Sequence, residues 1–245
     1  MPSPRAAVLD AEQHATLLPG DDERFSGWGL MGLPFRSGDV IAVRRFPASS
    51  VGPGYTSVWH RDPAGQWTFY ADVSPELACT RFFGSGVARS VVCPIVLDWD
   101  GEDRLHIEVA TGDLSCDVVV GDTAASRAMN LMSSALPERA WRSPGLLGVM
   151  AKMAGPLLGA GRLSMAGVAP NRQSFIANPR KIWMVRSASL KVGDRQTAEP
   201  GPVTPQAQLG DFLIPQRGIL AVGNTAFDAF DPARHSSAVS TPPRG

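Results

Sequence analysis

The sequence predicts a mainly β (α+β) fold, an antiparallel β-barrel or a strongly curved sheet with two inserted helices. Short runs rich in aromatic and β-branched residues recur between Gly/Pro-rich turns over most of the chain. The hydrophobic period changes to a helical one over residues 122–158 and then becomes strand-like again. An apolar helical stripe must be buried, and the open end of a barrel offers a surface for it, so we expect the helices to pack across that opening.

Length, composition and charge predict one globular domain. At 245 residues the chain can bury a large core, which we assign to residues 25–230. Residues 1–24 are polar and contain Pro, and we expect a flexible N-terminal arm; the Ser/Pro-rich residues 231–245 are expected to form a disordered tail. The 23 basic residues balance the 23 acidic residues, so the totals favour neither nucleic acid nor an anionic membrane as a partner, although a local patch is left open.

The first strand is expected over residues 40–46, after an irregular Gly-rich loop, and it leads into a β-hairpin over residues 55–72. The hairpin turn contains Pro63, which presets φ, and Gly65, which can take a positive φ. Because side chains alternate along a strand, one face of the hairpin is strongly apolar and the other is mixed. The apolar face carries Tyr55, Trp59 and Trp67, and the mixed face carries His60, Tyr70 and Asp72.

A meander and two helices follow the hairpin. The run 90–99 is almost continuously apolar and predicts a strand buried on both faces; strands over 104–110 and 114–120 come next. Apolar residues at helical spacing then predict two helices, the first ending at Pro137 and the second at Gly155-Pro156. The expected apolar stripes are Ala125, Ala128, Met129, Met132 and Leu136 on the first helix, and Leu146, Leu147, Met150, Met153 and Ala154 on the second.

The remaining strands are expected over residues 162–168, 181–192, 212–214 and 218–222, with a polar loop at 170–179. Residues 145–168 are apolar enough to raise the question of a membrane span. Lys152, Arg162 and the Gly155-Pro156 break leave no uncharged apolar run of the required length, so we predict no span. A core helix or a barrel lid is favoured over an interfacial helix, because the polar face is poor in Lys and Arg.

No metal or cofactor site is expected. The three cysteines, Cys79, Cys93 and Cys116, have no CxxC spacing and stand in apolar surroundings typical of buried, reduced thiols. No two histidines stand at ligand spacing, and Gly159-Ala160-Gly161 is only a fragment of a nucleotide-binding fingerprint. The N-terminal segment lacks the apolar core of a secretory signal, so we expect a cytoplasmic location.

The candidate functional residues fall into two groups. The acid–base candidates are His60, Tyr70 and Asp72. Asp98 and the His106–Glu108 pair are weaker candidates. Asp98 is included because an Asp inside an apolar run must be paired, hydrogen-bonded or at a strand end. The second group consists of aromatic residues on predicted strands, which build a core or, in a wide barrel, wall an apolar pocket. These candidate ligand-binding residues are Tyr55, Trp59, Trp67, Trp99 and Trp183.

The segment RRFPASSVGPGY resembles a motif of acetoacetate decarboxylase-like barrel proteins. Its matching residues are Arg44, Arg45, Pro47, Val51, Gly52, Pro53 and Tyr55, with Gly54 as a departure. The resemblance implies a β-barrel with an internal cavity. The decarboxylases of that family use a Schiff-base lysine, whereas Lys152, Lys181 and Lys191 all lie far from the strands after the motif, which puts decarboxylation in doubt. A lipocalin-like barrel is an analogy of architecture only.

These observations leave three functional hypotheses. The first is binding of a small, largely apolar molecule inside the barrel. The second is a cofactor-independent lyase or isomerase in the same cavity, with His60, Tyr70 and Asp72 or Asp98 moving protons. The third is a structural domain with a filled core, and self-association into a homo-oligomer is left open. A cavity without a His or Asp pointing into it favours binding, and one with such a group favours catalysis.

Overall fold

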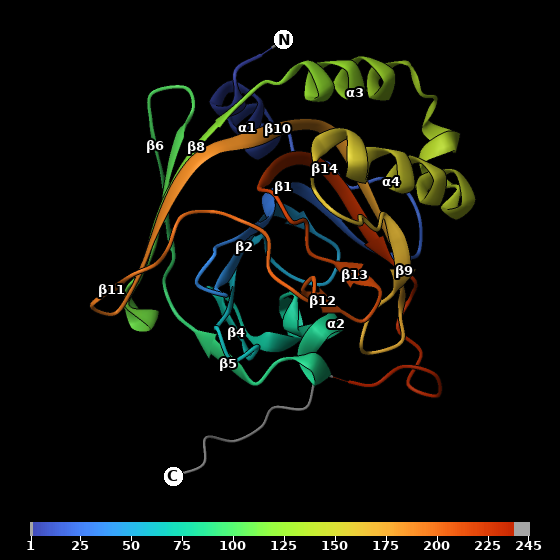
Figure 1. Ribbon diagram of the computed structural model, residues 1–245. Coiled ribbons are helices and arrows are strands. Elements are labelled where there is room, and N and C mark those ends of the chain that lie inside the picture. Colours follow the sequence, from blue (N-terminus) through green and yellow to red (C-terminus); the bar gives the residue numbers. More distant parts are fainter. Residues whose placement is uncertain (1, 238–245) are drawn as a thin grey trace.

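The computed structural model describes residues 2–237, and its main feature is one 12-stranded sheet that curls over on itself (Figure 1). The strand order is β5-β4-β3-β2-β1-β14-β10-β8-β7-β6, with β9 and β11 also pairing with β10. Every pair is antiparallel except β4 with β5. The predicted fold class, a mainly β protein with a strongly curved sheet and inserted helices, is confirmed.

The strands of the large sheet are β1 (Glu23–Pro34), β2 (Val40–Ser49), β3 (Tyr55–Arg61), β4 (Trp67–Ala71), β5 (Arg89–Val92), β6 (Val96–Asp100), β7 (Arg104–Val109), β8 (Leu114–Gly121), β9 (Ala166–Val168), β10 (Ser174–Val192), β11 (Arg195–Gln196) and β14 (Ile219–Phe227). A separate two-stranded sheet consists of β12 (Gln208–Leu209) and β13 (Phe212–Leu213).

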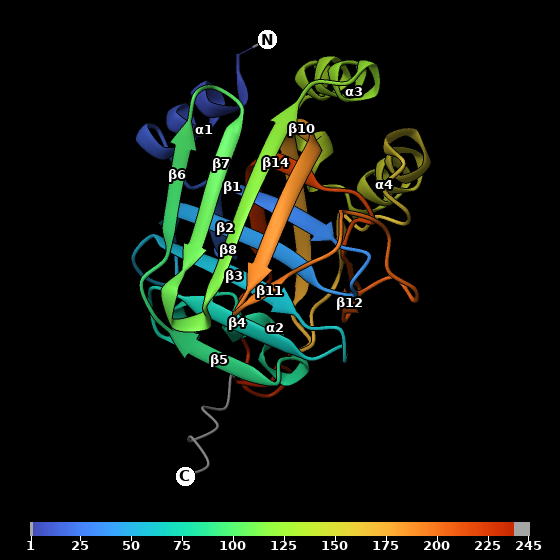
Figure 2. The same ribbon diagram turned by 60° about the vertical axis from the view of Figure 1, so that its left-hand side comes forward.

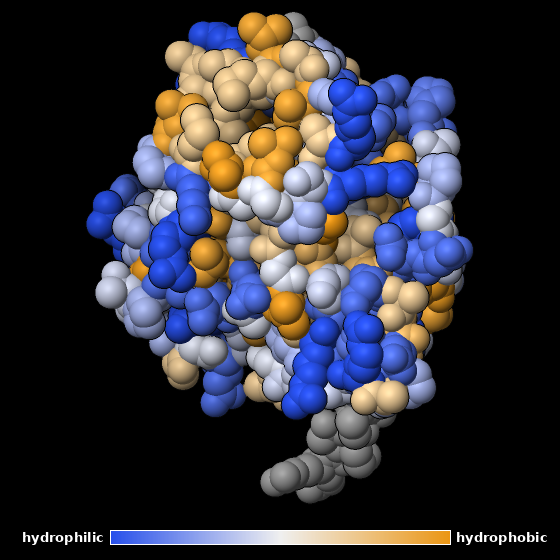
Figure 3. All heavy atoms as spheres, turned by 90° about the vertical axis from the view of Figure 1, so that its right-hand side faces the viewer, coloured by the Kyte–Doolittle hydropathy of each residue, from blue (hydrophilic) through white to orange (hydrophobic). Residues whose placement is uncertain are grey.

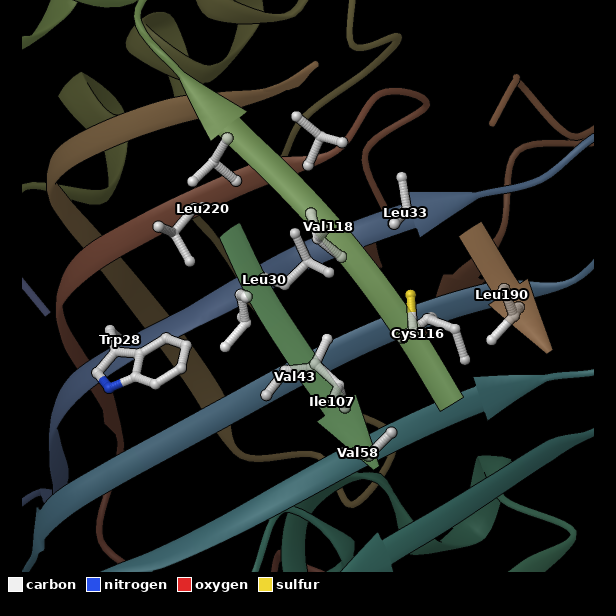
Figure 4. Packing of buried hydrophobic residues seen from close by; sticks show 14 of the residues in the cluster. Trp28, Leu30, Leu33, Val43, Val58, Ile107, Cys116, Val118, Leu190 and Leu220 are labelled. Atoms are coloured by element: carbon white, nitrogen blue, oxygen red, sulfur yellow. The ribbon is translucent and has the colours of Figure 1, made fainter. Parts of the chain in front are cut away.

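The curl brings the two ends of the sheet face to face. Strands β6, β7, β8 and β10 cross in front of β1–β4 (Figure 2). Side chains from both layers meet between them, where Ile107, Cys116 and Val118 pack against residues such as Leu30 and Val43 (Figure 4). In this first core, all five of these residues are completely buried.

The same strands carry a second core on their other face. Along β2, Ile41 and Val43 point to the first core, whereas Val40, Ala42 and Phe46 belong to an aromatic cluster on the opposite side. This division follows from the alternation of side chains along a strand. The second cluster is the one that borders the candidate site.

The predicted hairpin is confirmed, with Ser57 opposite Ala71 and Trp59 opposite Phe69 in the register of β3 and β4. The Trp59 and Phe69 rings stack with centroids 4.4 Å apart. The turn has Gly65 at φ +89°, and the Asp62 carboxylate accepts a hydrogen bond from the backbone N–H of Gln66. The faces are those expected from the sequence.

The apolar run over residues 90–99 is not one buried strand, and this expectation was wrong. Pro94 interrupts it, and its halves form β5 and β6, which lie at opposite edges of the sheet. Val92 and Val96 are exposed, because an edge strand that packs on one side leaves its other face to solvent.

The helices are α1 (Pro4–Gln13), the short α2 (Thr80–Phe83), α3 (Ala124–Ala135) and α4 (Pro144–Leu158). Short 3-10 turns cover Pro75–Leu77, Gly84–Gly86, Ala110–Gly112 and Glu138–Arg142. Helix α1 lies within the segment expected to be a flexible arm. Its Ala7 and Val8 are buried against the first core, and the Glu12 carboxylate pairs with Arg45. The Ser3 hydroxyl caps the N-terminus of this helix by accepting a hydrogen bond from the backbone N–H of Ala6.

The domain boundaries at residues 25 and 230 stay a prediction. Of the tail expected over residues 231–245, residues 238–245 lie outside the described part of the chain. His235, within the described part, is buried, and its Nδ1 accepts a hydrogen bond from the backbone N–H of Asp231.

Helices α3 and α4 cover one side of the sheet, as expected of the two inserted helices, but they do so with different faces. Helix α3 buries Ser126, Asn130 and Ser133. Of its predicted apolar stripe, Ala125, Met129 and Leu136 are half-buried against the protein, whereas Ala128 and Met132 are exposed. Helix α4 buries Leu147, Ala151, Ala154 and Leu158, and it continues through Gly155-Pro156 to end at Gly159, which has a left-handed φ of +61°.

Candidate functional site

A cavity of about 140 Å³ lies between the second core and the two inserted helices. Strands β1, β2, β3, β10 and β14 form its floor, and α2, α3 and α4 contribute to its walls. Most of its lining is aromatic or aliphatic, with Phe82 and Phe227 stacked at 3.7 Å between ring centroids. Met129 of α3 and Met150 of α4 face it, so the helical insert closes one side of the cavity.

Arg44 is the only charged residue in the described wall of this cavity. It follows the apolar alternation of β2, which directs its side chain to the same face as Ala42 and Phe46. Only 5% of the residue is exposed. Nη1 donates hydrogen bonds to the backbone carbonyls of Leu30 and Val43, both at 2.8 Å, and Nη2 donates one to Met31 at 3.3 Å.

The guanidinium of Arg44 has aromatic neighbours and no carboxylate partner. It lies 4.6 Å from the centroid of the Trp59 ring and 5.5 Å from that of Phe212. Burial lowers the pKa of Arg44 to about 10, so the group stays charged at neutral pH. Within residues 2–237, no Asp or Glu stands at ion-pair distance from it, and two of its five N–H groups donate no hydrogen bond to the protein.

A phenol and a thiol stand next to this charge. The Tyr55 hydroxyl and the Cys79 Sγ are 3.2 Å apart, and both side chains line the cavity. Burial raises the pKa of Tyr55 well above its usual value and raises that of Cys79 as well. Both groups are therefore neutral at pH 7 and can offer hydrogen bonds, but neither supplies a negative charge to Arg44.

Two further polar atoms of the wall have no partner. The Asn178 Oδ1 and the Trp141 Nε1 are buried, and neither forms a hydrogen bond with any described residue. Buried polar atoms are nearly always paired in proteins, so an unpaired acceptor and an unpaired donor in one cavity wall mark places where a ligand can bind.

The five aromatic residues predicted to bind a ligand separate in the structure. Tyr55 and Trp59 line the cavity. Trp67 is buried at the far side of the aromatic cluster, Trp99 packs against Trp28 with centroids 6.3 Å apart, and Trp183 lies in the first core. None of these last three lines the cavity.

The three acid–base candidates, His60, Tyr70 and Asp72, share the expected face of the hairpin, but that face turns away from the cavity. Asp72 lies opposite Thr56 and accepts a hydrogen bond from its backbone N–H at 2.8 Å. His60 is four residues further along β3, a separation of about 13 Å at about 3.3 Å per residue. The structure does not bring the three side chains together.

His60 instead belongs to a charge cluster around the buried carboxylate of Asp39. Its Nε2 lies 2.9 Å from the Asp39 Oδ1, and the Arg195 guanidinium donates to both oxygens of that carboxylate at 2.8 and 3.0 Å. Burial raises the pKa of Asp39, but the hydrogen bonds from His60, Arg195 and Ser37 outweigh it, and the net pKa lies below its usual range. Asp39 is fully buried and fully paired, which fits a structural role.

The weaker candidates lie at the surface. Asp98 is exposed on the edge strand β6, and His106 pairs with Asp117 at 2.9 Å on the outer face of β7. Among residues 2–237, no group of three or more His, Cys, Asp or Glu side chains is arranged to hold a metal ion. The cysteines Cys79, Cys93 and Cys116 are buried and form no disulfide.

Sequence reasoning missed Arg44, Asn178 and Trp141 as members of a site. For Arg44 a signal was present, because Val40, Ala42 and Phe46 put position 44 on an apolar face. Asn178 stands in a segment expected to be a polar loop, and Trp141 stands between two helices, where no periodic pattern gives its direction.

No protein-family model matches the sequence, and neither does any curated protein. Among solved structures, this chain is similar to the crystal structure of acetoacetate decarboxylase from Legionella pneumophila, with a TM-score of 0.39 and 8% sequence identity. The similarity covers 92% of this chain and 90% of that one. This structure is from the same family that the sequence segment resembles, and the resemblance is a loose one.

Proposed function

We propose that the cavity binds a small organic acid, with an apolar body the size of about one aromatic ring and a carboxylate that pairs with Arg44. The observation that carries the proposal is a buried guanidinium in a mostly apolar wall, with no carboxylate partner among residues 2–237. Burying an unpaired charge costs several kcal/mol, roughly, and a protein keeps such a charge most readily where a ligand supplies the opposite one.

The free donors of Arg44 suit a carboxylate. Three N–H groups hold the side chain to backbone carbonyls, which fixes its position, and the remaining two are available to an anion. A planar guanidinium in a dry site binds a carboxylate through short, charge-assisted hydrogen bonds. The Tyr55 hydroxyl is a further donor in the same wall.

The volume and lining of the cavity limit the rest of the ligand. An apolar cavity of roughly 150 Å³ accommodates a molecule of about the size of benzene. The stacked and tilted Phe rings of the wall would pack on a flat or branched apolar body. Asn178 and Trp141 add an unpaired acceptor and donor that could receive one more polar group.

Binding is better supported than the alternative of a lyase or isomerase. Within the described wall there is no His, Asp, Glu or Lys, and the ionisable Tyr55 and Cys79 have raised pKa values. General acid–base catalysis needs a group whose pKa is near the working pH. His60, Tyr70 and Asp72 do not border the cavity.

The test compares two probes of the same shape, phenylacetate and its neutral amide, by isothermal titration calorimetry. A hydrogen bond to a charged group contributes about 1.5–3 kcal/mol, so the acid is expected to bind at least about tenfold more tightly. The variant Arg44→Gln is expected to remove this preference.

Arg45→Gln is the matched control, because Arg45 is the next residue of β2, faces the other side and pairs with Glu12. It is expected to keep the preference for the acid. Equal affinity of the unmodified protein for both probes, or no binding by any member of a panel of ring-sized acids, would overturn the proposal.

A further inference from the structure

The outer surface of the helical insert is apolar where it faces solvent. On α4, Leu146, Val149, Met153 and Leu157 follow one another at helical spacing and are all exposed. They form a ridge about 17 Å long, at about 1.5 Å per residue. Leu131 and Met132 of α3 are exposed as well, Leu131 to 73%. We name these six residues the insert face; apolar residues gather in the upper part of the molecule where α3 and α4 lie (Figure 3).

The packing of α4 against the protein does not account for the exposed apolar residues of the insert face. The inward-facing residues of α4, such as Ala154 and Leu158, are buried against the protein and line the cavity. The helix is therefore apolar on both sides, and its exposed side is the more unusual of the two, because contiguous exposed apolar residues mark interaction sites.

The charged residues of the segment that carries the insert face are mostly basic. Residues 123–162 contain five basic residues and one acidic residue, whereas the whole chain is balanced. All five basic side chains are exposed, and the acidic one, Glu138, is paired with Arg180 at 2.6 Å. Arg127 stands one helical turn from Leu131, and Lys152 flanks Met153. The other basic residues are Arg139, Arg142 and Arg162.

From this arrangement we infer that the insert face docks on a membrane surface that contains anionic lipids. Apolar side chains flanked by Lys and Arg are the combination that holds a helix in the lipid interface. From the sequence, an interfacial helix was disfavoured because the polar face of residues 145–168 is poor in Lys and Arg. The segments before and after α4 add Arg127, Arg139, Arg142 and Arg162, all of them exposed.

The same charges argue against a second copy of this chain as the occupant. In a two-fold contact the same patch meets itself, so the basic side chains of one copy would face those of the other. Like charges across an interface oppose association, whereas an anionic bilayer complements both the ridge and its flanks. Among residues 2–237, no helix is long and apolar enough to cross a membrane.

The test is flotation of the full chain with vesicles of phosphatidylcholine plus phosphatidylserine, and with phosphatidylcholine alone. The protein is expected to float with the anionic vesicles, less with the neutral ones, and less at high salt. The variant Val149→Ser/Met153→Ser/Leu157→Ser is expected to stay unbound. Val92→Ser/Val96→Ser, which changes exposed valines on the sheet edges, is the matched control and is expected to bind like the unmodified protein.

A single charge reversal keeps the test decisive if the triple variant does not fold. Lys152→Glu is expected to reduce partitioning by at least about fivefold, since each basic residue near an anionic surface contributes about that factor. Lys191→Glu, an exposed lysine on β10, is expected to have no such effect. The inference is overturned if the unmodified protein binds neither vesicle, if the triple variant binds unchanged, or if ultracentrifugation finds a dimer that the triple variant separates.

Discussion

At the scale of single residues, the two most buried charges of the protein differ in their partners. Asp39 has a cation, a histidine and a hydroxyl around its carboxylate, so each oxygen accepts at least two hydrogen bonds. Arg44 has only backbone carbonyls and aromatic faces. A buried charge whose hydrogen-bonding capacity is filled by protein groups stabilises the surrounding fold, whereas a buried charge with free donors is available to a ligand.

Asp39 predicts how stability changes in acid. Its pKa in the folded protein lies below the ordinary Asp value, because hydrogen bonds from His60, Arg195 and Ser37 outweigh the effect of burial. A group with a lowered folded pKa contributes its stability above the unfolded pKa, about 3.9, and loses it as the pH falls below that value. We expect the free energy of unfolding, measured with urea, to fall as the pH drops through this range.

The variant Asp39→Asn isolates this effect. It is expected to be about 1–3 kcal/mol less stable at pH 7, since it weakens charge-assisted hydrogen bonds in a buried place. Its stability is also expected to change less between pH 5 and pH 3, an interval of about two units around the unfolded pKa. A variant with the same acid dependence as the unmodified protein would show that another carboxylate is responsible.

At the scale of elements, α3 takes over the hydrogen bonding of a strand. The β8 ladder ends where Gly121 pairs with Met184 of β10. Beyond that point, the Asn130 side chain donates to the Ile182 carbonyl and accepts from its N–H, both at 2.8 Å, and the Ser133 hydroxyl donates to the Arg180 carbonyl. The helix thus satisfies backbone groups that would otherwise be unpaired at a sheet edge.

Asn130→Ala is therefore expected to cost about 2–4 kcal/mol, because it leaves a buried donor and a buried acceptor of β10 without partners. Urea unfolding gives the total, and hydrogen exchange is expected to show faster exchange at Ile182 and along α3. Ser134→Ala, at an exposed position of the same helix, serves as the comparison and is expected to change stability little. Equal effects of the two variants would contradict the role of Asn130.

This polar stripe also explains where the sequence analysis was wrong. Hydrophobic periodicity places the apolar residues of α3 inside, but the strand edge below it selects Asn130 and Ser133. Periodicity also joined β5 and β6 into one buried strand, because Pro94 gives no information on which edge each half reaches. Local patterns predict the element type and its faces, as in the hairpin, but not the element that a face meets.

At the scale of the whole molecule, the pairings that close the sheet link distant parts of the chain. Strand β1 pairs with β14 near the end of the described chain, and β10 runs for 19 residues across both layers. The sequence predicted the curved sheet and a strand over residues 181–192. It was wrong for β1, which was expected to be an irregular Gly-rich loop, and for the first part of β10, which was expected to be a polar loop. The strand order could not be predicted from the sequence. Nor could the position of Asn178, which borders the cavity next to the register shift after Pro179 in β10.

The separation of the two cores predicts that stability and binding can be changed independently. Ile107→Ala, in the completely buried first core, is expected to cost about 2–5 kcal/mol in the free energy of unfolding while leaving the affinity for phenylacetate unchanged. Phe175→Leu, in the cavity wall, is expected to change that affinity with a smaller loss of stability. Urea unfolding and calorimetry on both variants check this, and a loss of affinity in Ile107→Ala would contradict it.

Strands β1, β2 and β3 send alternate side chains into the first core, so their backbones are also held from the face opposite the cavity. Single substitutions at the positions that face the cavity can therefore change its shape and polarity while the backbone stays the same. A descendant of this chain could acquire a different ligand through substitutions on one side of three strands, while it keeps the same fold.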